Sequence, residues 1–513
     1  VTSNDSVTFD NIGQVVTLEV KSAQNDTTVN YDYQALVGDA DNMTIVVKGT
    51  NGTDISIDDD NPLDSSVIET VTINSQSVAN TIDSLDLSKV SPGSLVVTGD
   101  KKLTITSALN STIKTVDASG STGGLTLSTS PGAANFTIVG SSAADAITDT
   151  TAGNANVSGG AGNDTLTVGA SWDGYDVFDG GDGIDTLVIT DDFEPLNTGP
   201  ASANTIAAGL SNVETISLSG ANKKITLDKD MGALDTLVIS DATKQVINLN
   251  DGYVGDTTVV IGTATSTSNR DAIEQIVNTA NVDLSIYAKV GDIDGSTASK
   301  TTITGGAGQD TLYLYNVVSG DTTAVLAGTA DSITGVDKIV ILDGTAGNDV
   351  TITTGDYALA NALGAVLPLT IDGSAMGATE VLTVTGTGAT AKLNIIGGDA
   401  SDDFTGGNAA DTISGGAGND VIDANAGAGN VIDGGAGNDS ITLGDGVDNI
   451  SGGAGNDTIT AEAPGTQLKL NDTIDGGDGT DTLTITGGNI TSATVFGGVS
   501  NIEKIKPTDG SDI

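Results

Sequence analysis

Aspartate and glycine recur at fixed positions over residues 397–460. Seven consecutive turns begin at residues 397, 406, 415, 424, 434, 443 and 452, so their spacing is nine residues with one step of ten. Six of these turns carry an aspartate at the sixth position, namely Asp402, Asp411, Asp420, Asp439, Asp448 and Asp457. Carboxylates and backbone carbonyls, with no His or Cys in the chain, form an oxygen-only ligand set. Such a set favours a hard cation, and its flexible geometry suits calcium better than magnesium.

A short extended segment must follow each turn to hold these aspartates in place. The eighth position is β-branched or aromatic in the same six turns: Phe404, Ile413, Ile422, Ile441, Ile450 and Ile459. Glycines permit the positive φ that a tight turn needs, and β-branched residues favour strands. A flexible glycine-rich linker would not place an apolar residue at every ninth position. The stretch therefore predicts units in which six residues turn and three extend.

This pattern resembles the G-G-x-G-x-D-x-U-x nonapeptide of the RTX calcium β-roll. The resemblance implies that a calcium ion lies between turns n and n+2, which stack on the same side. One side would carry the turns at 397, 415, 434 and 452, and we predict three good sites there. The other side would carry the turns at 406, 424 and 443. In its middle turn Gly429 and Asn430 replace the acid, so we predict weak or empty sites.

Further motifs lie outside this stretch. GGAGND (159–164) and GGDGID (180–185) are close enough in sequence for Asp164 and Asp185 to share an ion, and Asp457 pairs with Asp481 by the same reasoning. GGAGQD (305–310) has no partner in register nearby, and GTAGND (344–349) is interpreted as a turn alone.

The predicted metal-binding residues fall into three groups. The sixth-position acids are Asp164, Asp185, Asp310, Asp402, Asp411, Asp420, Asp439, Asp448, Asp457 and Asp481. The third-position acids, for which solvated surface carboxylates are the alternative interpretation, are Asp182, Asp399 and Asp478. The turn glycines are Gly160, Gly162, Gly181, Gly183, Gly416, Gly418, Gly435, Gly437, Gly453, Gly455, Gly477 and Gly479.

The charge balance limits the possible partners and chemistry. The 513 residues include 68 acidic and 18 basic side chains, which gives a formal net charge of −50. Such a charge argues against nucleic acid and anionic membranes as direct partners, and bound cations would offset its self-repulsion. Without His there is neither an H-E-x-x-H site nor a Ser-His-Asp triad. A two-carboxylate glycosidase would have only Trp172 and few other aromatic residues to stack sugars on. We therefore expect no enzymatic activity.

Longer repeats extend through the chain. Similar endings recur as VIETVTI (67–73), LSNVETI (210–216), ITGVDKI (333–339) and VSNIEKI (499–505). The predicted fold class is all-β, with calcium-bound parallel β-roll or β-solenoid segments within a long repetitive β architecture. We predict an N-terminal β region (1–110), a β module with RTX turns (111–220), a β module with one RTX turn and a short helix (221–345), and a β module with the main β-roll (346–513).

Three local predictions accompany this division. The alternating apolar runs of residues 1–110 fit a β-sandwich and a solenoid equally well. The capping residues and apolar spacing of residues 268–277 predict a short helix, and residues 356–363 form a weaker helical candidate. No apolar run or leader predicts a transmembrane helix or a Sec-type signal, and Val1 is interpreted as the start of a processed or trimmed fragment.

Together these features resemble the calcium-binding part of surface-layer proteins that some Gram-negative bacteria export by a type I pathway. The resemblance implies a chain that leaves the cell unfolded, folds on extracellular calcium, and self-assembles into a lattice on the cell surface. It also implies lipopolysaccharide as an anchor, held by a region upstream of Val1. Extracellular calcium sites bind at about 10⁻⁴ to 10⁻³ M, concentrations found outside the cell. Acids that could bridge neighbouring copies are Asp58, Asp59, Asp60, Asp191 and Asp192.

Two alternatives remain open at this point. The chain could be an RTX adhesin or extracellular matrix filament protein that binds a surface or a sugar through its N-terminal half. It could also be a secretion passenger fragment whose activity lies elsewhere in a precursor.

Overall fold

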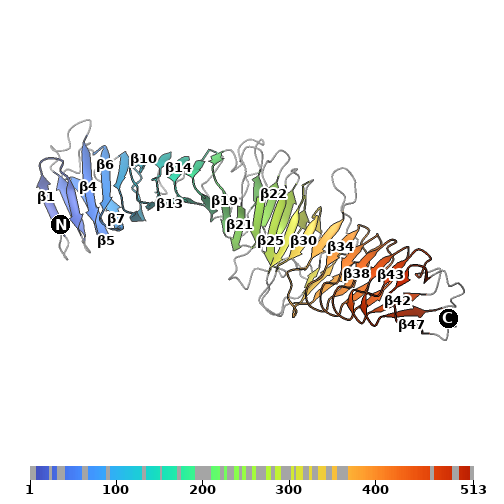
Figure 1. Ribbon diagram of the computed structural model, residues 1–513. Coiled ribbons are helices and arrows are strands. Elements are labelled where there is room, and N and C mark those ends of the chain that lie inside the picture. The colour runs from blue at the N-terminus through green and yellow to red at the C-terminus, as the bar shows by residue number, and fades with distance from the viewer. Residues whose placement is uncertain are drawn as a thin grey trace. The chain divides into compact units, whose positions relative to one another are not determined.

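The protein forms two compact units, Val1–Val238 and Ile239–Ile513, in the computed structural model (Figure 1). The described residues are 7–21, 26–31, 41–59, 68–87, 93–129, 135–150, 153–169, 175–190, 209–219, 224–227, 236–241, 245–249, 257–261, 273–278, 283–289, 302–305, 308–315, 323–325, 333–342, 349–354, 368–462, 467–487 and 496–508. Within these ranges there is no α-helix, and strands stack as successive rungs in each unit.

In the first unit the chain alternates between two sheets. One sheet contains β1 (Val7–Ile12), β3 (Thr27–Tyr31), β5 (Asn51–Asp59), β7 (Asn80–Asp86), β9 (Leu103–Ala108), β11 (Leu125–Ser128), β13 (Ala146–Asp149), β15 (Thr165–Val168), β17 (Thr186–Ile189) and β19 (Thr215–Ser219). The other contains β2 (Leu18–Lys21), β4 (Asn42–Lys48), β6 (Thr70–Gln76), β8 (Ser94–Gly99), β10 (Thr115–Asp117), β12 (Phe136–Val139), β14 (Ala155–Ala161), β16 (Val177–Asp182) and β18 (Leu210–Ser211). Next in the chain come β20 (Lys224–Leu227) and β21 (Thr236–Asp241).

Every strand pair of the N-terminal region is parallel. For example, β4 pairs with β6 from Asn42↔Thr70 to Lys48↔Gln76, and β3 pairs with β5 from Thr27↔Ile55 to Tyr31↔Asp59. Parallel neighbours need a crossover between them, and here the strand of the opposite sheet supplies it. The described strands from β1 to β9 therefore form a solenoid, which excludes the β-sandwich that the sequence left open.

The second unit continues the same alternation. One series contains β23 (Thr257–Ile261), β25 (Leu284–Lys289), β27 (Thr311–Tyr315), β30 (Lys338–Ile341), β32 (Leu369–Asp372), β34 (Leu393–Ile396), β36 (Thr412–Ser414), β38 (Val431–Asp433), β40 (Asn449–Ser451), β43 (Thr473–Asp475) and β46 (Val499–Ser500). Opposite it, the early coils have β22 (Gln245–Leu249), β24 (Ile273–Asn278), β26 (Thr302–Thr304) and β29 (Ile333–Thr334). The later coils have β28 (Thr323–Val325), β31 (Val350–Thr353), β33 (Leu382–Thr385), β35 (Asp403–Thr405), β37 (Val421–Asp423), β39 (Ser440–Thr442), β42 (Thr458–Glu462), β45 (Thr482–Thr486) and β47 (Lys504–Pro507). A small pair, β41 (Ala454–Gly455) and β44 (Asp478–Gly479), joins two turns.

The core of each unit is a narrow column of aliphatic side chains, one layer per coil. Ile413 pairs with Ile432 and Ile432 with Ile450, and all three are buried. On the opposite sheet Phe404 pairs with Ile422, and the row continues with buried residues Ile441, Ile459 and Leu483. The predicted eighth-position residues are thus confirmed as the interior of the roll. Each buried layer stabilises the stack by about 1.5–3 kcal/mol per side chain.

The predicted helix over residues 268–277 is wrong where the structure describes it. Ile273–Asn278 is strand β24, which lies between β22 and β26 with Ile276 paired to Ile247 and Ile303. Ile276 is fully buried, so stacking between coils overrides the local helical spacing. Residues 268–272 and 356–363 lie outside the described residues. The module boundaries near residues 110, 220 and 345 stay predictions.

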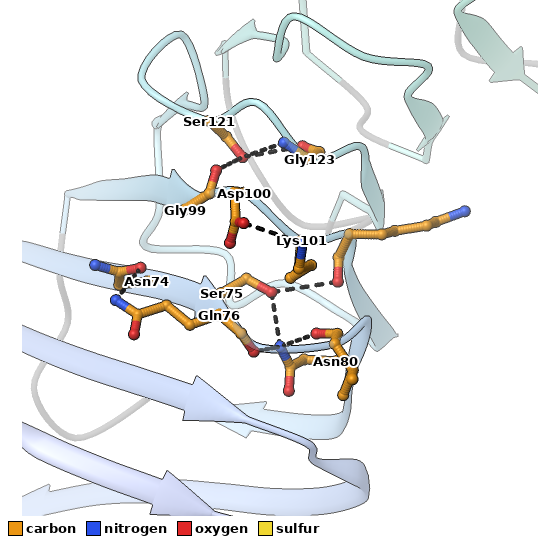
Figure 2. A network of polar contacts seen from close by, with 11 residues as sticks. Asn74, Ser75, Gln76, Asn80, Gly99, Asp100, Lys101, Ser121 and Gly123 are labelled. Carbon is orange, nitrogen blue, oxygen red and sulfur yellow. Dashed lines mark hydrogen bonds and ion pairs between the residues drawn. The ribbon is translucent and has the colours of Figure 1, made fainter.

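One corner of the N-terminal coils is closed by the uncharged side chains of Asn80 and Ser75 (Figure 2). Asn80, 1% exposed, accepts the amide hydrogens of Gly49 and Thr50 at 2.6 and 3.0 Å through Oδ1, and its Nδ2 donates to Ser75 Oγ at 2.9 Å. Ser75 in turn donates to the Lys102 carbonyl at 3.2 Å. This corner therefore satisfies its buried polar groups without a carboxylate. In contrast, the Asp41 amide donates to Glu69 Oε2 at 2.6 Å.

Candidate metal centre

The glycine turns stack on two sides, in the order that the nonapeptide spacing predicts. The strands after the turns at 397, 415, 434, 452 and 476 are β35, β37, β39, β42 and β45, and each pairs with the next. The strands after the turns at 406, 424 and 443 are β36, β38 and β40, which pair in the other sheet. The prediction that turns n and n+2 are neighbours is confirmed.

A ladder of buried carboxylates joins the sixth positions along the first side. The amide of Asp402 donates to Oδ1 of Asp420 at 2.7 Å, and that of Asp420 donates to Oδ1 of Asp439 at 2.8 Å. The ladder continues to Asp457 and Asp481 at 2.8 Å per step. A shorter ladder in the first unit joins Asp145, Asp164 and Asp185 at 2.8 and 2.7 Å. In each step the aspartate accepts an amide of the preceding coil through Oδ1 alone, and this bond fixes the register between the two coils.

The second carboxylate oxygen separates the turns into two kinds. We call a turn open when Oδ2 of its sixth-position aspartate is buried and has no hydrogen-bond partner. The open turns carry Asp164, Asp185, Asp420, Asp439, Asp448, Asp457 and Asp481. A buried carboxylate oxygen without a donor is costly, and a proton or a bound cation would remove that cost.

In a closed turn, by contrast, Oδ2 of the sixth-position aspartate accepts a backbone amide of the same turn. Gly398 N–H donates to Asp402 Oδ2 at 2.8 Å, and Gly407 N–H donates to Asp411 Oδ2 at 2.6 Å. In the first unit Ser141 N–H donates to Asp145 Oδ2 at 2.6 Å. The closed turns are therefore those at 140, 397 and 406, and both oxygens of their carboxylates accept backbone amides.

The fourth residue of the turn distinguishes the two kinds. Among the turns described in full, closed turns have alanine there, namely Ala143, Ala400 and Ala409, and none of these has a positive φ. Open turns have glycine there with φ between 115° and 149°, namely Gly162, Gly183, Gly418, Gly437, Gly446, Gly455 and Gly479. An alanine pays a steric cost at such a φ, so position four decides which backbone shape is accessible.

Glycine is required at these turns for space as well as for φ. A Cβ on Gly437, where φ is 141°, would lie 1.5 Å from the Gly418 carbonyl oxygen of the preceding coil. A Cβ on Gly415 would lie 2.2 Å from the Gly434 carbonyl oxygen and 2.3 Å from Asp420 Oδ2. The Gly434 carbonyl oxygen of one coil and the unpaired Oδ2 of Asp420 in the previous coil thus both lie close to the space beside the Gly415 Cα. All the turn glycines predicted from the sequence have positive φ.

The second side of the roll contains a different polar series. Asp411 N–H donates to Asn430 Oδ1 at 2.9 Å, Asn430 N–H to Asp448 Oδ1 at 2.8 Å, and Asp448 N–H to Asp472 Oδ1 at 3.0 Å. Asn430 Nδ2 donates to the Gly427 carbonyl at 2.8 Å. The asparagine therefore replaces a carboxylate with an amide whose hydrogens occupy a turn carbonyl. Of the described residues in this series, Asp448 alone carries a buried Oδ2 without a hydrogen-bond partner.

The glycine motifs outside residues 397–460 also lie in register with neighbouring coils. Asp164 and Asp185, and Asp457 and Asp481, lie on adjacent coils as predicted. GGAGQD was predicted to have no second glycine motif in register, and the acid that follows it in the stack comes from ITGVDKI (333–339): Asp310 N–H donates to Asp337 Oδ2 at 2.9 Å. Asp310 is fully buried, and its Oδ1 accepts the Leu284 amide at 3.0 Å. Most of GTAGND lies outside the described residues, but Asp349 Oδ1 accepts the amide of Val381 at 3.0 Å.

The third-position acids occupy a different environment. Asp182, Asp399 and Asp478 are exposed, whereas the sixth-position acids are buried. Their role as ligands stays a prediction.

Sequence reasoning missed the acids that end each row. Glu214 Oε2 accepts the Asp185 amide at 2.8 Å, and Glu503 Oε2 accepts the Asp481 amide at 2.7 Å. Asn212 and Asn501, two residues earlier, have φ of 51° and 52°. The recurring endings LSNVETI and VSNIEKI were the available signal, because they place an asparagine two residues before a glutamate. We call these two endings terminating turns. Asp472 on the second side was missed because no glycine motif surrounds it.

Burial strongly perturbs the ladder carboxylates. Desolvation raises the pKa of Asp164 and of Asp420 to about 7 and that of Asp439 to about 6, and neighbouring ladder carboxylates add to the rise. Burial likewise raises the pKa of Asp457, and the nearby Asp481 carboxylate acts in the same direction. Near neutral pH these groups are therefore poised between binding a proton and binding a cation.

The donor set fits a hard cation held partly by the backbone. In the described part of the chain no three acidic side chains come together around one point, so carboxylates alone cannot form a cage. An ion at an open turn would be held by the unpaired Oδ2 and by turn carbonyls, and it would supply positive charge where no donor reaches. Oxygen ligands of this kind suit calcium.

Comparison with known proteins agrees with this arrangement. The profile described as RTX calcium-binding nonapeptide repeat (4 copies) matches residues 149–187, 301–315, 396–431, 427–459 and 471–489. The matched ranges include the open turns, the turns at 305 and 424, and the closed turns at 397 and 406, but not the closed turn at 140. Searches of curated proteins and of solved structures give no match. Among the residues described above, no helical segment has the length and apolar character that a membrane crossing requires.

Proposed function

We propose that this chain is a non-enzymatic, secreted structural protein that folds on extracellular calcium and then self-assembles into a surface-layer lattice. The observation that carries the calcium step is the row of buried, unpaired Oδ2 atoms in Asp420, Asp439, Asp457 and Asp481. RTX calcium-binding nonapeptide repeats at the same residues support the choice of ion and an extracellular location.

Calcium would act on the protein in two ways. Locally it would supply the missing partner of each open-turn carboxylate, which removes the cost of burying an unpaired charge. Globally it would reduce the self-repulsion of a chain whose net charge is −50. Both effects are absent when calcium is scarce, so the chain would stay extended during type I export and compact outside the cell.

The proposed lattice is supported by the repetitive architecture and not by an individual binding site. A solenoid exposes long, regular rows of side chains, which suits repeated lateral contacts between copies. Exposed acids such as Asp182 and Asp478 could share ions with a neighbouring copy. Of the bridging acids predicted from the sequence, Asp58 and Asp59 end strand β5, whereas Asp60, Asp191 and Asp192 lie outside the described residues. Lipopolysaccharide stays a predicted anchor.

The test is to compare chelated and calcium-loaded protein by circular dichroism, light scattering and negative-stain electron microscopy. We expect ordered arrays and the full β signal with calcium, and after chelation the loss of the arrays and of the part of the β signal that comes from the open turns. Assembly and a full β signal that both survive chelation would contradict the proposal. Calcium-dependent folding into monomers that bind cells or glycans would instead favour the RTX adhesin.

A further inference from the structure

The two rows of consecutive open turns are each bracketed by a closed turn and a terminating turn. On the first side of the roll the closed turn at 397 precedes the open turns at 415, 434, 452 and 476, and the row ends at the terminating turn of Glu503. In the first unit the closed turn at 140 precedes the open turns at 159 and 180, and that row ends at Glu214. The same order thus occurs twice, in separate units.

The closed turn offers the next coil the same backbone contact that an open turn does. Ala417 N–H donates to the Gly398 carbonyl at 2.9 Å, as Ala436 N–H donates to the Gly416 carbonyl at 2.9 Å. In the first unit Ala161 N–H donates to the Ser141 carbonyl at 3.1 Å. A closed turn can therefore act as a template for the first open turn.

The closed turn reaches this shape with its own groups. Asp402 accepts the Leu382 amide through Oδ1 and the Gly398 amide through Oδ2, both at 2.8 Å, so both oxygens have donors. Each oxygen thus already accepts a buried amide, so a cation would find less uncompensated negative charge here than at the unpaired Oδ2 of an open turn. The hydrogen bonds offset part of the cost of burying this carboxylate, although burial still raises its pKa.

We propose that the closed turns at 140, 397 and 406 are cation-free caps, and that cation binding is confined to turns with glycine at position four. The caps at 140 and 397 form before calcium arrives and start the two rows, and Glu214 and Glu503 end them. This inference rests on calcium binding as proposed above. It adds that open turns bind calcium and closed turns do not, and that each row forms from its closed turn towards its terminating turn.

Two matched aspartate substitutions test the assignment. Asp439→Asn alters an open turn and should lower the number of calcium ions bound per chain, counted by equilibrium dialysis or native mass spectrometry. Asp402→Asn alters a closed turn and should leave that number at the wild-type value. Loss of equally many ions in both variants would overturn the inference.

A gain of binding provides a second test, which does not depend on a substitution that weakens a cap. Ala400→Gly gives the closed turn at 397 the glycine that open turns have at position four. This turn stacks on the open turn at 415, and the substitution should raise the number of bound ions by one. The control Ala410→Gly makes the same chemical change at position five of the turn at 406 and should leave the number unchanged. An unchanged number in Ala400→Gly, or an equal gain in Ala410→Gly, would contradict the role of position four.

Hydrogen exchange of the wild-type chain tests the order of formation. After chelation, peptides covering residues 393–411 should keep most of their amide protection, whereas peptides covering 434–460 should lose theirs. Simultaneous loss in both segments would overturn the idea of a preformed cap. Failure of the proposed function is distinguishable, because in that case the wild-type chain would bind no calcium at all.

Discussion

The amide of Asp457 donates to Oδ1 of Asp481 at 2.8 Å, although 24 residues separate the two. The earlier steps of the same ladder span 18 or 19 residues, with bond lengths of 2.7 or 2.8 Å. Strand pairing is also maintained, since Ile459 lies opposite Leu483. The buried carboxylate therefore sets the register between coils, and additional residues are accommodated away from the ladder.

Replacing Asp481 with alanine should destabilise the calcium-loaded second unit. The substitution leaves the buried Asp457 amide without its acceptor, which costs about 1–3 kcal/mol. Urea unfolding in excess calcium measures the loss. Asp478→Ala, at an exposed position of the same turn, should change the unfolding free energy by less than about 0.5 kcal/mol. An equal loss in this control would instead identify Asp478 as a calcium ligand.

The apolar column should be sensitive to truncation whether or not calcium is present. Phe404 is fully buried between the layers of Val384 and Ile422, so Phe404→Ala should cost about 3–5 kcal/mol of unfolding free energy. Thermal and urea unfolding check this value. The matched control is Val421→Ala on the neighbouring strand, where the side chain is 50% exposed and the expected loss is below about 1 kcal/mol. Similar losses at both positions would mean that the column is not the core.

How far the sequence predicts this molecule depends on which residues carry the periodic signal. The nine-residue repeat correctly predicted that the turns stack on two sides. It also predicted the burial of Ile422 on one side and of Ile413 and Ile450, the neighbours of Ile432, on the other, because one residue in each turn must face inward. The helix expected at Ile273 was wrong, because apolar spacing in a short segment cannot reveal the coils stacked above and below it.

The polar details were less accessible from sequence for a similar reason. Asp402 and Asp420 both occupy position six, yet only one has a free oxygen, because the difference lies in the backbone at position four. Glu214 and Glu503 contact the ladder from coils that lack the glycine motif. Long-range register, not local pattern, places these side chains.

The N-terminal corner at Asn80 should be independent of calcium. Asn80→Ala removes the acceptor of the Gly49 and Thr50 amides, both of which are held in a buried corner. We expect a loss of about 1–3 kcal/mol in the first unit, equal with calcium and with chelator. Hydrogen exchange of peptides covering residues 42–59 localises the effect. A loss seen only in chelator would show that this corner also depends on a cation.

The stability of the calcium-free protein should fall as pH rises towards neutral. In the folded chain Asp164 and Asp420 have a pKa of about 7 and Asp439 of about 6, against 3.8 for an ordinary aspartate. Between about pH 4 and pH 7 the folded state therefore binds more protons than the unfolded state. The unfolding free energy must decrease as pH rises through this window, and the contribution of these groups is lost above it.

Calcium binding should accordingly release protons in the same window. At pH 6 an ion entering the open turns must displace protons from these carboxylates, whereas at pH 8.5 they are already deprotonated. Titration calorimetry in buffers of different ionisation enthalpy measures the number released, and Asp439→Asn should reduce it at pH 6. Unfolding of the chelated protein at about 1 M salt, where general surface repulsion is screened, isolates the buried groups. Stability that rises from pH 5 to pH 7.5 under those conditions would show that the ladder carboxylates are charged without calcium, and that the open turns have partners other than a proton or a cation.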